Sequence, residues 1–387
     1  MDTILIYDFG GQTCQLISRR IREFGVYSEV VPHDYRIPRE KLAEVKGIIL
    51  SGSPYSVYDE DSPLANPEIL GLGLPVLGIC YGLHYLIHTL GGKVAPREKR
   101  EYGRARLHFN EESPLFRGVP GGFVSWMSHG DSIDVPAEGF RVTAVSEHKI
   151  PAALENRERR FYGIQFHPEV THCEYGTRIL GNFALGIAGA RKEWSMKAYI
   201  ESVSAEIHSR VGGRKALLLI SGGVDSTVTA AILLRALPPA QVHLMYIDTG
   251  LMRKNESAEV EATLGGLGAA NLHLIDASEK FLTALAGEED PEKKRRIIGD
   301  MFISVQEEEV AKLAIHNAFL VQGTLYTDLI ESGKGVGKKA NTIKSHHNVR
   351  TPLVEEKRKK GLIIEPLDKL YKDEVRVLGR ELGLSPG

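Results

Sequence analysis

Short apolar runs bounded by glycine, proline or serine recur in the N-terminal part of the chain. They cover residues 3–7, 46–50 and 75–79. Runs of this length without polar alternation are typical of buried parallel strands. Between the first two runs, residues 12–24 have helical spacing, and Leu16, Ile17 and Ile21 are expected on one face. Strands that alternate with helices predict a doubly wound α/β domain.

From about residue 104 to residue 166 the pattern changes to alternating strands with turn signals such as Gly121-Gly122. This change predicts an antiparallel extension, so the sheet of the first domain is expected to be mixed. A predicted helix over residues 174–187 leads into the small and charged stretch 188–193, which is typical of a linker.

A second α/β pattern follows the predicted linker. It comprises helix 196–210, strand 215–220, helix 227–237 and strand 242–247. Residues 332–340 are rich in glycine and lysine, which predicts a mobile loop. The chain is therefore expected to form two doubly wound α/β domains, over residues 1–190 and 191–387. The first domain would have a mixed sheet and the second a parallel sheet.

Composition narrows the class of protein. With 387 residues, 42% hydrophobic and 25% charged, the chain is too long for one core and has the composition of a globular protein. A net charge of -2 provides no general attraction for nucleic acid or for an anionic membrane, and no apolar run is long enough to span a bilayer. The three cysteines contain no C-x-x-C pair, which excludes a disulfide scaffold and fits a reducing cytoplasm.

The segment Gly78-Ile79-Cys80-Tyr81-Gly82 places a cysteine directly after a predicted buried strand. A G-x-C-x-G turn between strand and helix is typical of a nucleophile elbow, and the N-terminus of the following helix favours the thiolate. A free cysteine is commonly just a small buried residue, so the turn alone leaves both interpretations open.

Residues 165–169 add a histidine and a glutamate, in the order Gln-Phe-His-Pro-Glu. Pro168 favours extended backbone before it, and residues two apart in an extended chain point to one side. His167 could therefore take the proton of Cys80 while Glu169 orients the imidazole. An exposed His-Pro-Glu turn is common by itself, but together with the elbow the pattern favours a catalytic triad.

A third segment, residues 51–54 (Ser-Gly-Ser-Pro), follows the strand predicted over residues 46–50. Backbone N–H groups at Gly52 and Tyr81 could stabilise a tetrahedral oxyanion. An ordinary strand-to-helix turn is the alternative.

These three segments resemble the class I glutamine amidotransferase domain. The resemblance implies that glutamine is hydrolysed to glutamate and ammonia through a thioester on Cys80. Residues 126–131 (Trp-Met-Ser-His-Gly-Asp) also match the family in a segment that holds the substrate. The implied glutamine-binding residues are His84, Ser128, His129 and Asp131. His84 stands where the family usually has a glutamine that contacts the substrate.

A second candidate site follows the strand predicted over residues 215–220. Successive backbone N–H groups and a helix N-terminus form an anion-binding loop there. The loop comprises Ser221, Gly222, Gly223, Val224, Asp225, Ser226 and Thr227. It lacks the lysine of a Walker A loop. Asp225 beside phosphates is the expected ligand of Mg²⁺, which would enter with ATP.

The string Ser-Gly-Gly-Val-Asp-Ser resembles the ATP pyrophosphatase loop, and later segments resemble the GMP synthetase family. Those segments are residues 247–256, 294–299, 322–326, 343–348 and 372–376. Taken singly they are equally typical of solvated charged loops. The resemblance implies amination of XMP to GMP, with AMP and pyrophosphate released. It also implies that Lys344 contacts ATP and Arg295 serves the XMP site.

The chain departs from this family in three places. Thr249 and Thr327 stand where the family usually has asparagine and proline. The family also continues beyond Gly387 into a module that forms a homodimer and completes the XMP site, so XMP binding and dimerisation are both in question. Two other interpretations remain open: a pyrophosphatase that modifies tRNA, and a non-catalytic remnant. The absence of any cysteine after Cys173 weighs against the first of these.

Overall fold

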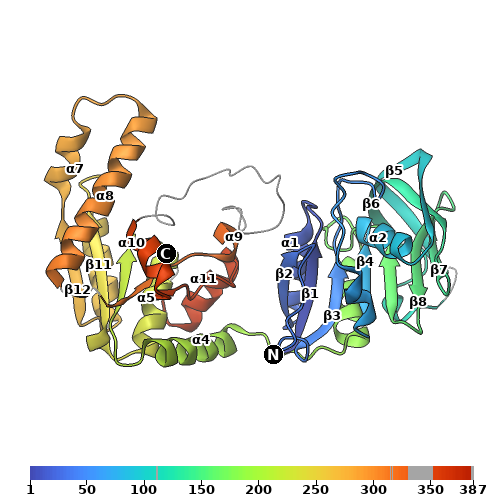
Figure 1. Ribbon diagram of the computed structural model, residues 1–387, viewed down its shortest axis with the longest axis horizontal. Coiled ribbons are helices and arrows are strands. Elements are labelled where there is room, and N and C mark those ends of the chain that lie inside the picture. The colour runs from blue at the N-terminus through green and yellow to red at the C-terminus, as the bar shows by residue number, and fades with distance from the viewer. Residues whose placement is uncertain (110–111, 314, 316, 330–351, 385–387) are drawn as a thin grey trace. The chain divides into compact units, whose positions relative to one another are not determined.

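The computed structural model describes residues 1–109, 112–313, 315, 317–329 and 352–384 (Figure 1). The described residues form two compact units, which divide between Trp194 and Ser195. The predicted loop 332–340 and Lys344 lie outside the described residues.

The first unit is built on a nine-stranded sheet with the order β2-β1-β3-β4-β9-β8-β7-β5-β6. The sheet is parallel from β2 to β9 in this order. It is antiparallel from β9 to β6, so β9 joins the two parts. Their bounds are β1 Thr3–Asp8, β2 Tyr27–Pro32, β3 Val45–Leu50, β4 Val76–Ile79, β5 Lys93–Phe109, β6 Val124–Val135, β7 Arg141–Ser146, β8 Pro151–Asn156 and β9 Phe161–Ile164.

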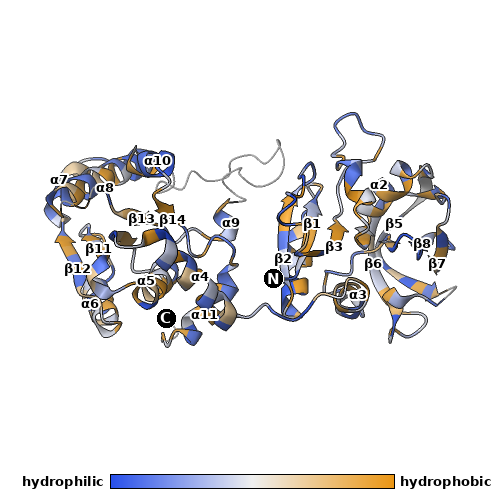
Figure 2. Ribbon diagram, turned by 60° about the horizontal axis from the view of Figure 1, so that its bottom comes forward, coloured by the Kyte–Doolittle hydropathy of each residue, from blue (hydrophilic) through white to orange (hydrophobic). Residues whose placement is uncertain are grey.

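Helices cover both faces of this sheet, as alternation along β1 shows. Ile4 and Ile6 pack in one apolar cluster with helix α1 (Cys14–Glu23) and helix α3 (Gly176–Gly181). Leu5 and Tyr7 pack in another cluster with helix α2 (Tyr81–Thr89). Figure 2 shows hydrophobic residues gathered in central strands such as β3. Three short helical segments complete the unit: η1 Pro67–Gly71, η2 Pro114–Phe116 and η3 Asn182–Ile187.

Two expectations for this unit need correction. Leu16 does not share the buried face of α1, because it is 37% exposed while Ile17 and Ile21 are fully buried. The buried stripe of α1 runs through Ile17 and Ile21, one helical turn apart, and Leu16 lies about 100° away from Ile17. The antiparallel part also begins earlier than predicted, since β5 starts at Lys93.

The stretch expected to be a linker is fastened to the first unit. The Arg191 guanidinium pairs with the Asp2 carboxylate at 3.0 Å. The Trp194 N–H donates to the Gly25 carbonyl at 2.8 Å, and its ring lies 4.9 Å from that of Tyr27. The Arg191 guanidinium overcomes the effect of burial and lowers the pKa of Asp2 to about 2.

The second unit contains a five-stranded parallel sheet with the order β12-β11-β10-β13-β14. The strands are β10 Ala216–Ile220, β11 Val242–Asp248, β12 Asn271–Asp276, β13 Phe319–Val321 and β14 Ile363–Ile364. From β10 the chain adds β11 and β12 on one side and then returns to add β13 and β14 on the other side. The strand order therefore reverses between β10 and β13. Ligands of open α/β sheets bind at such a point, outside the carboxyl ends of the strands.

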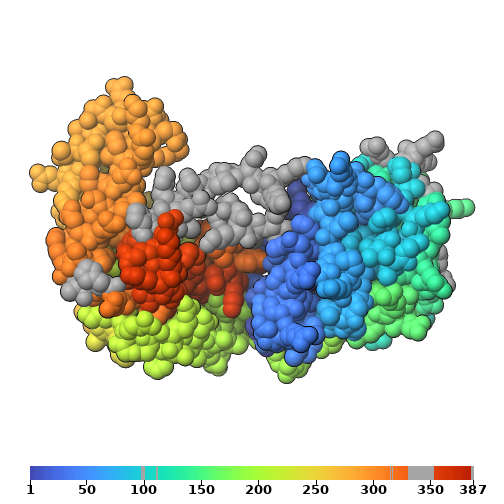
Figure 3. All heavy atoms as spheres, in the orientation of Figure 1, coloured from blue at the N-terminus to red at the C-terminus, as the bar shows by residue number. Residues whose placement is uncertain are grey.

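Helices also lie on both faces of the second sheet. They are α4 Met196–Val211, α5 Val224–Ala236, η4 Pro239–Gln241, α6 Glu256–Gly266, α7 Ser278–Leu285, α8 Pro291–Leu313, α9 Tyr326–Leu329, α10 Pro352–Lys359 and α11 Lys372–Glu381. The helices α7 and α8 form a hairpin that projects from the rest of this unit (Figures 1 and 3). Helix α5 begins at Val224, three residues before the predicted start, so residues 224–227 of the predicted loop form its first turn.

Among the described residues, no helix is long and apolar enough to cross a membrane. The α/β class, with one mixed and one parallel sheet, is confirmed.

Candidate active sites

The predicted elbow is present at Cys80, the residue between β4 and α2. Its φ of 52° lies in the left-handed region, which an L-residue rarely adopts. The flanking glycines are required by close packing: a Cβ at Gly82 would lie 2.2 Å from the Leu50 carbonyl oxygen, and one at Gly78 would lie 2.6 Å from Gly82. The turn therefore holds Cys80 at the N-terminus of α2, where the helix field favours a negative sulfur.

His167 and Glu169 come together as their spacing predicts. The Nδ1 atom of His167 lies 2.8 Å from Oε1 of Glu169, and the Glu169 side chain is fully buried. Burial lowers the pKa of His167, but hydrogen bonds to Cys80 and Glu169 outweigh it and raise the pKa to about 10. The imidazole thus lines the same cavity as Cys80 with a raised basicity, as a general base for this nucleophile requires.

The two expected oxyanion donors also lie beside this group. A Cβ at Gly52 would be 3.2 Å from His167 Cε1 and 3.8 Å from the Cβ of Cys80, so Gly52 adjoins both side chains. In the described part of the chain, neither the Gly52 nor the Tyr81 backbone N–H has a hydrogen-bond acceptor. Both N–H groups are therefore free to bind a developing oxyanion.

A cavity of about 740 Å³ opens over the sulfur. It is large enough for an amino acid substrate. The sequence-predicted residues of the first site that line it are Gly52, Cys80, Tyr81, His84, Ser128, His129, Asp131 and His167. The structure therefore brings together all of the predicted residues of this site except Glu169, which lies behind His167.

Strand β6 carries Ser128, His129 and Asp131 to the cavity. The Ser128 carbonyl oxygen is 3.7 Å from the sulfur of Cys80. His129 is buried, and its Nδ1 lies 2.8 Å from the Asp131 carbonyl oxygen. Its Nε2 lies 3.3 Å from Glu101 Oε2, within ion-pair distance, but neither atom has a hydrogen-bond partner among the described residues.

Glu101 is a buried residue that sequence reasoning missed. It lies on β5 directly opposite His129 on β6. Burial opposes ionisation, but polar contacts with His129, Ser146 and His148 outweigh it and lower the pKa of Glu101 to about 2. Only the strand pairing reveals this contact, because 28 positions separate Glu101 from His129 in the chain.

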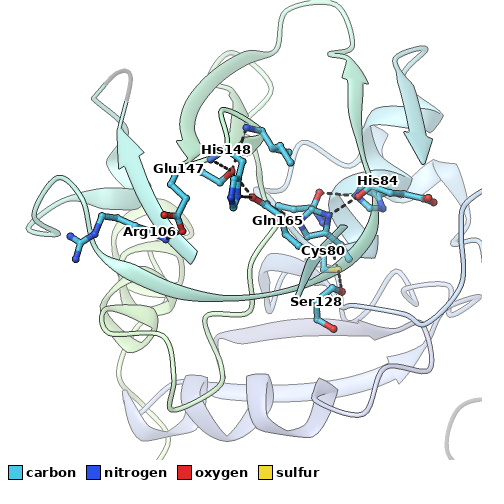
Figure 4. A network of polar contacts seen from close by, with 12 residues as sticks. Cys80, His84, Arg106, Ser128, Glu147, His148 and Gln165 are labelled. Carbon is cyan, nitrogen blue, oxygen red and sulfur yellow. Dashed lines mark hydrogen bonds and ion pairs between the residues drawn. The ribbon is translucent and has the colours of Figure 1, made fainter. Parts of the chain in front are cut away.

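Gln165 is a second missed residue, and it joins His84 to the nucleophile (Figure 4). His84 Nε2 lies 2.7 Å from Gln165 Oε1, and Gln165 Nε2 lies 3.7 Å from the sulfur of Cys80. Burial lowers the pKa of His84 to about 4, so this imidazole is neutral at pH 7. The period of two that predicts His167 and Glu169 on one side of an extended chain could also have found Gln165.

The predicted phosphate loop joins β10 to α5. Gly222 has a φ of +78°, and its backbone lies near Glu256 and Val260 of α6. The hydroxyl groups of Ser226 and Thr227 donate to the Gly223 carbonyl oxygen at 2.9 and 3.1 Å. These bonds close the loop around the start of α5, whose first N–H groups form an anion site.

Asp225 lies in the first turn of α5 with an unsatisfied carboxylate. Its Oδ1 atom is buried and has no hydrogen-bond partner in the described residues, while Oδ2 lies 3.7 Å from Lys372 Nζ. Among all of the described residues, no group of three or more His, Cys, Asp or Glu side chains could hold a metal ion by itself. One carboxylate with an unbonded Oδ1 atom fits Mg²⁺ that arrives with phosphate oxygens as its other ligands.

The neighbouring loop after β13 packs against this site. Gly323 is close to α5, because a Cβ there would lie 3.2 Å from Thr229 Oγ1. The Thr324 hydroxyl donates to Glu365 Oε1 at 2.8 Å, just after β14. The loops after β10, β13 and β14 thus meet where the strand order reverses.

Arg295 is not placed with the phosphate loop. It lies in the first turns of α8, near the end of the projecting α7–α8 hairpin. Among the described residues, its ion pair is with Glu292 of the same helix rather than with the loop of residues 221–227.

A family model for class-I glutamine amidotransferases matches residues 5–187. The chain is 48% identical to the glutamine-hydrolyzing GMP synthase of Enterococcus faecalis over 388 residues, which cover 99% of this chain and 73% of that protein. It is also 48% identical to the protein of the same name from Geobacillus kaustophilus, with 99% and 74% covered. Neither alternative interpretation finds support among these relatives.

A solved structure from Thermoplasma acidophilum, described as that of a putative GMP synthase subunit, is 30% identical. It covers 49% of this chain and 94% of its own, with a TM-score of 0.43.

Proposed function

The chain belongs to the family of glutamine-hydrolyzing GMP synthases, which are ligases, and from this we propose how its residues divide the reaction. The first unit releases ammonia from glutamine, and the second activates XMP with ATP. The ammonia then converts the activated XMP to GMP. Its three free cysteines fit work in a reducing cytoplasm.

In the first half-reaction the Cys80 thiolate attacks the amide carbon of glutamine. The N–H groups of Gly52 and Tyr81 stabilise the oxyanion, and protonated His167 gives its proton to the departing ammonia. Water, deprotonated by His167, then hydrolyses the thioester to glutamate and restores the thiolate–imidazolium pair. Glu169 holds the imidazole throughout. The bond of 2.8 Å between His167 and Glu169 behind the elbow carries this assignment.

In the second half-reaction the loop of residues 221–227 binds the phosphates of ATP. The C2 oxygen of XMP attacks the α-phosphorus, and pyrophosphate leaves. Ammonia then displaces AMP to form GMP. Asp225 would hold Mg²⁺, which when bound offsets the charge of the phosphates. The buried, unpaired Oδ1 atom of Asp225 supports this role.

Four further residues belong to the proposal. His84, Ser128, His129 and Asp131 line the cavity where the α-amino and carboxylate groups of glutamine would lie. The roles of Lys344 toward ATP and of Arg295 toward XMP stay predictions.

Substitutions in the triad test the first half. Cys80→Ala and His167→Ala should each abolish glutamine hydrolysis, and the double variant should be no worse, because the two residues act as one unit. Glu169→Gln should retain more activity, since Glu169 orients the base without transferring a proton. Release of glutamate is the measurement. Wild-type turnover in Cys80→Ala would refute the nucleophile.

Product analysis tests the second half. Wild-type protein given XMP, ATP, Mg²⁺ and ammonium should release AMP and pyrophosphate. Release of ADP and phosphate instead would contradict the pyrophosphatase assignment.

A further inference from the structure

We propose that Gln165 is a positioning residue for the nucleophile, which donates an amide N–H to the Cys80 sulfur while His84 fixes the amide orientation (Figure 4). This inference rests on the proposed role of Cys80. The amide N–H of Gln165 would be a hydrogen-bond donor to the thiolate, and this donor is not part of the triad. His84 would thus act on the enzyme's own sulfur through Gln165, in addition to lining the glutamine cavity.

In the structure the Gln165 amide turns its oxygen to His84 and its nitrogen to Cys80, and this orientation fixes the tautomer of His84. A neutral imidazole carries one N–H, and Oε1 of Gln165 can only accept. The proton of His84 must therefore sit on Nε2 to form the bond of 2.7 Å. With Oε1 engaged in this way, the NH₂ group of Gln165 faces the sulfur. A flipped amide would pair with the other tautomer of His84 and set a carbonyl oxygen against the sulfur, which would favour the neutral thiol, so the two orientations predict opposite effects on the thiolate.

The other contacts of the sulfur make this donor significant. The Ser128 carbonyl oxygen, 3.7 Å from the sulfur, can only accept and so favours the neutral thiol. His167 lines the same cavity as Cys80, and Cys80 and Glu169 raise the pKa of its imidazole, which favours a positive charge there. Gln165 adds a second N–H that favours the thiolate. Besides these, the titratable groups around the cavity and the triad are Glu169, His129, Asp131, His84, Asp59, Tyr55, Tyr81 and Tyr102.

The framework around Gln165 is rigid enough for positioning. Gln165 is fully buried, and its backbone N–H donates to the Ala152 carbonyl oxygen of β8 at 2.9 Å. His84 follows Cys80 by one helical turn, and its backbone N–H donates to the Cys80 carbonyl oxygen at 3.2 Å. Cys80, His84 and Gln165 thus close a triangle between α2 and the segment after β9.

The rate at which iodoacetamide alkylates Cys80 in the full chain tests the proposal. Mass spectrometry of the Cys80 peptide, from about pH 5.5 to 9, separates it from Cys14 and Cys173. Gln165→Leu should lower the rate near neutral pH roughly tenfold, since a hydrogen bond to a charged group is lost. The pH of half-maximal rate should rise. Gln165→Glu should raise it further, because it adds negative charge beside the sulfur.

Variants of His84 test the same proposal independently of the Gln165 variants. His84→Leu should shift the profile in the same direction, because the amide of Gln165 is no longer held. His84→Gln should stay near wild type, since its amide can donate to Oε1. His88→Ala is the matched control, because this exposed histidine lies one turn further along α2 and should leave the profile unchanged.

Unchanged alkylation profiles in Gln165→Leu and His84→Leu would overturn the proposal, even if glutamine turnover fell, because a purely structural role predicts that result. Should either Gln165 variant not fold, the contrast between His84→Leu and His84→Gln decides. Failure of the proposed function is distinguishable: Cys80→Ala would then still hydrolyse glutamine, whatever the profiles show.

Discussion

Cys80 bears a conformational cost that its chemistry explains. A non-glycine residue in a sparsely populated backbone region costs on the order of 1–3 kcal/mol and persists where the surrounding structure enforces it. Here the φ of 52° is enforced by Gly78 and Gly82, which let β4 and α2 approach closely. The strained turn presents the sulfur to the cavity at the start of a helix.

Relief of this strain gives a first prediction. Cys80→Gly should be more stable than Cys80→Ala by about 1 kcal/mol, because glycine adopts a positive φ without penalty. Both variants should lack glutamine hydrolysis. Urea denaturation monitored by circular dichroism measures the difference. Equal stabilities would show that the turn stores no strain.

The buried neutral His84 gives a second prediction. Burial lowers its pKa to about 4 in the folded protein, so below pH 6.5 the unfolded chain binds a proton that the folded chain does not. Stability should therefore be lost as the pH falls from about 6.5 to 4, by roughly 3 kcal/mol. His84→Gln lacks this loss. Parallel stability–pH curves for wild type and His84→Gln would contradict the assignment.

Much of the site could be predicted residue by residue because its groups lie within short segments. The spacing of His167 and Glu169 is local, and so is the elbow around Cys80. Glu101 escaped because its role depends on a contact with His129 on the neighbouring strand, which leaves no local signal in one sequence. The spacing of Gln165 from His167 and Glu169 was a local signal, but its contact with His84 of α2 was not.

At the scale of elements, the two sites share one arrangement, in which a buried strand is followed by a glycine-containing turn and then by a helix. Strand β4 leads through Cys80 into α2, and β10 leads through Gly222 into α5. In both, the helix N-terminus favours the negative charge that we propose there, a thiolate in one site and phosphates in the other. The apolar runs predicted these strands well.

Other elements were missed or misjudged for physical reasons. Strand β2 has polar residues such as Ser28 and Glu29 and lies at the sheet edge, so it lacks the continuous apolar run of its neighbours. Helix α5 begins at Val224 because the side chains of Ser226 and Thr227 bond back to Gly223 and let the helix start inside the loop.

The phosphate loop yields a third prediction. Gly222→Ala should weaken ATP binding and destabilise the protein by about 1–2 kcal/mol, because its φ is +78° and the new Cβ would lie 3.1 Å from Glu256 Oε1. Gly223→Ala is the matched control for stability. Its Cβ would meet Ser221 Oγ at 3.5 Å, an ordinary contact. Calorimetric titration with ATP and thermal unfolding are the measurements. An equal loss of stability in both variants would argue against a special role for Gly222.

At the scale of the whole molecule, one half-reaction is assigned to each compact unit. The described residues of each unit contain a complete sheet with its own cores, and the sheets differ in kind. Alternation of strand and helix along the chain is the signal from which two domains are expected. The order of the nine strands, and with it the pairing of β5 with both β6 and β7, depends on contacts distant in sequence and could not be predicted.

This division predicts that damage to one site spares the other. Asp225→Asn should lower GMP formation by at least about tenfold with either nitrogen source, since it removes the carboxylate proposed to hold Mg²⁺. Its hydrolysis of glutamine should persist. A parallel loss of glutamine hydrolysis would contradict the division.

The most direct test measures GMP formed from saturating XMP and Mg·ATP with either glutamine or ammonium as the nitrogen source. Wild type should use both sources, and Cys80→Ala should form GMP from ammonium alone. If Cys80→Ala formed GMP from glutamine as fast as wild type, ammonia would not come from Cys80 and the proposed mechanism would be wrong.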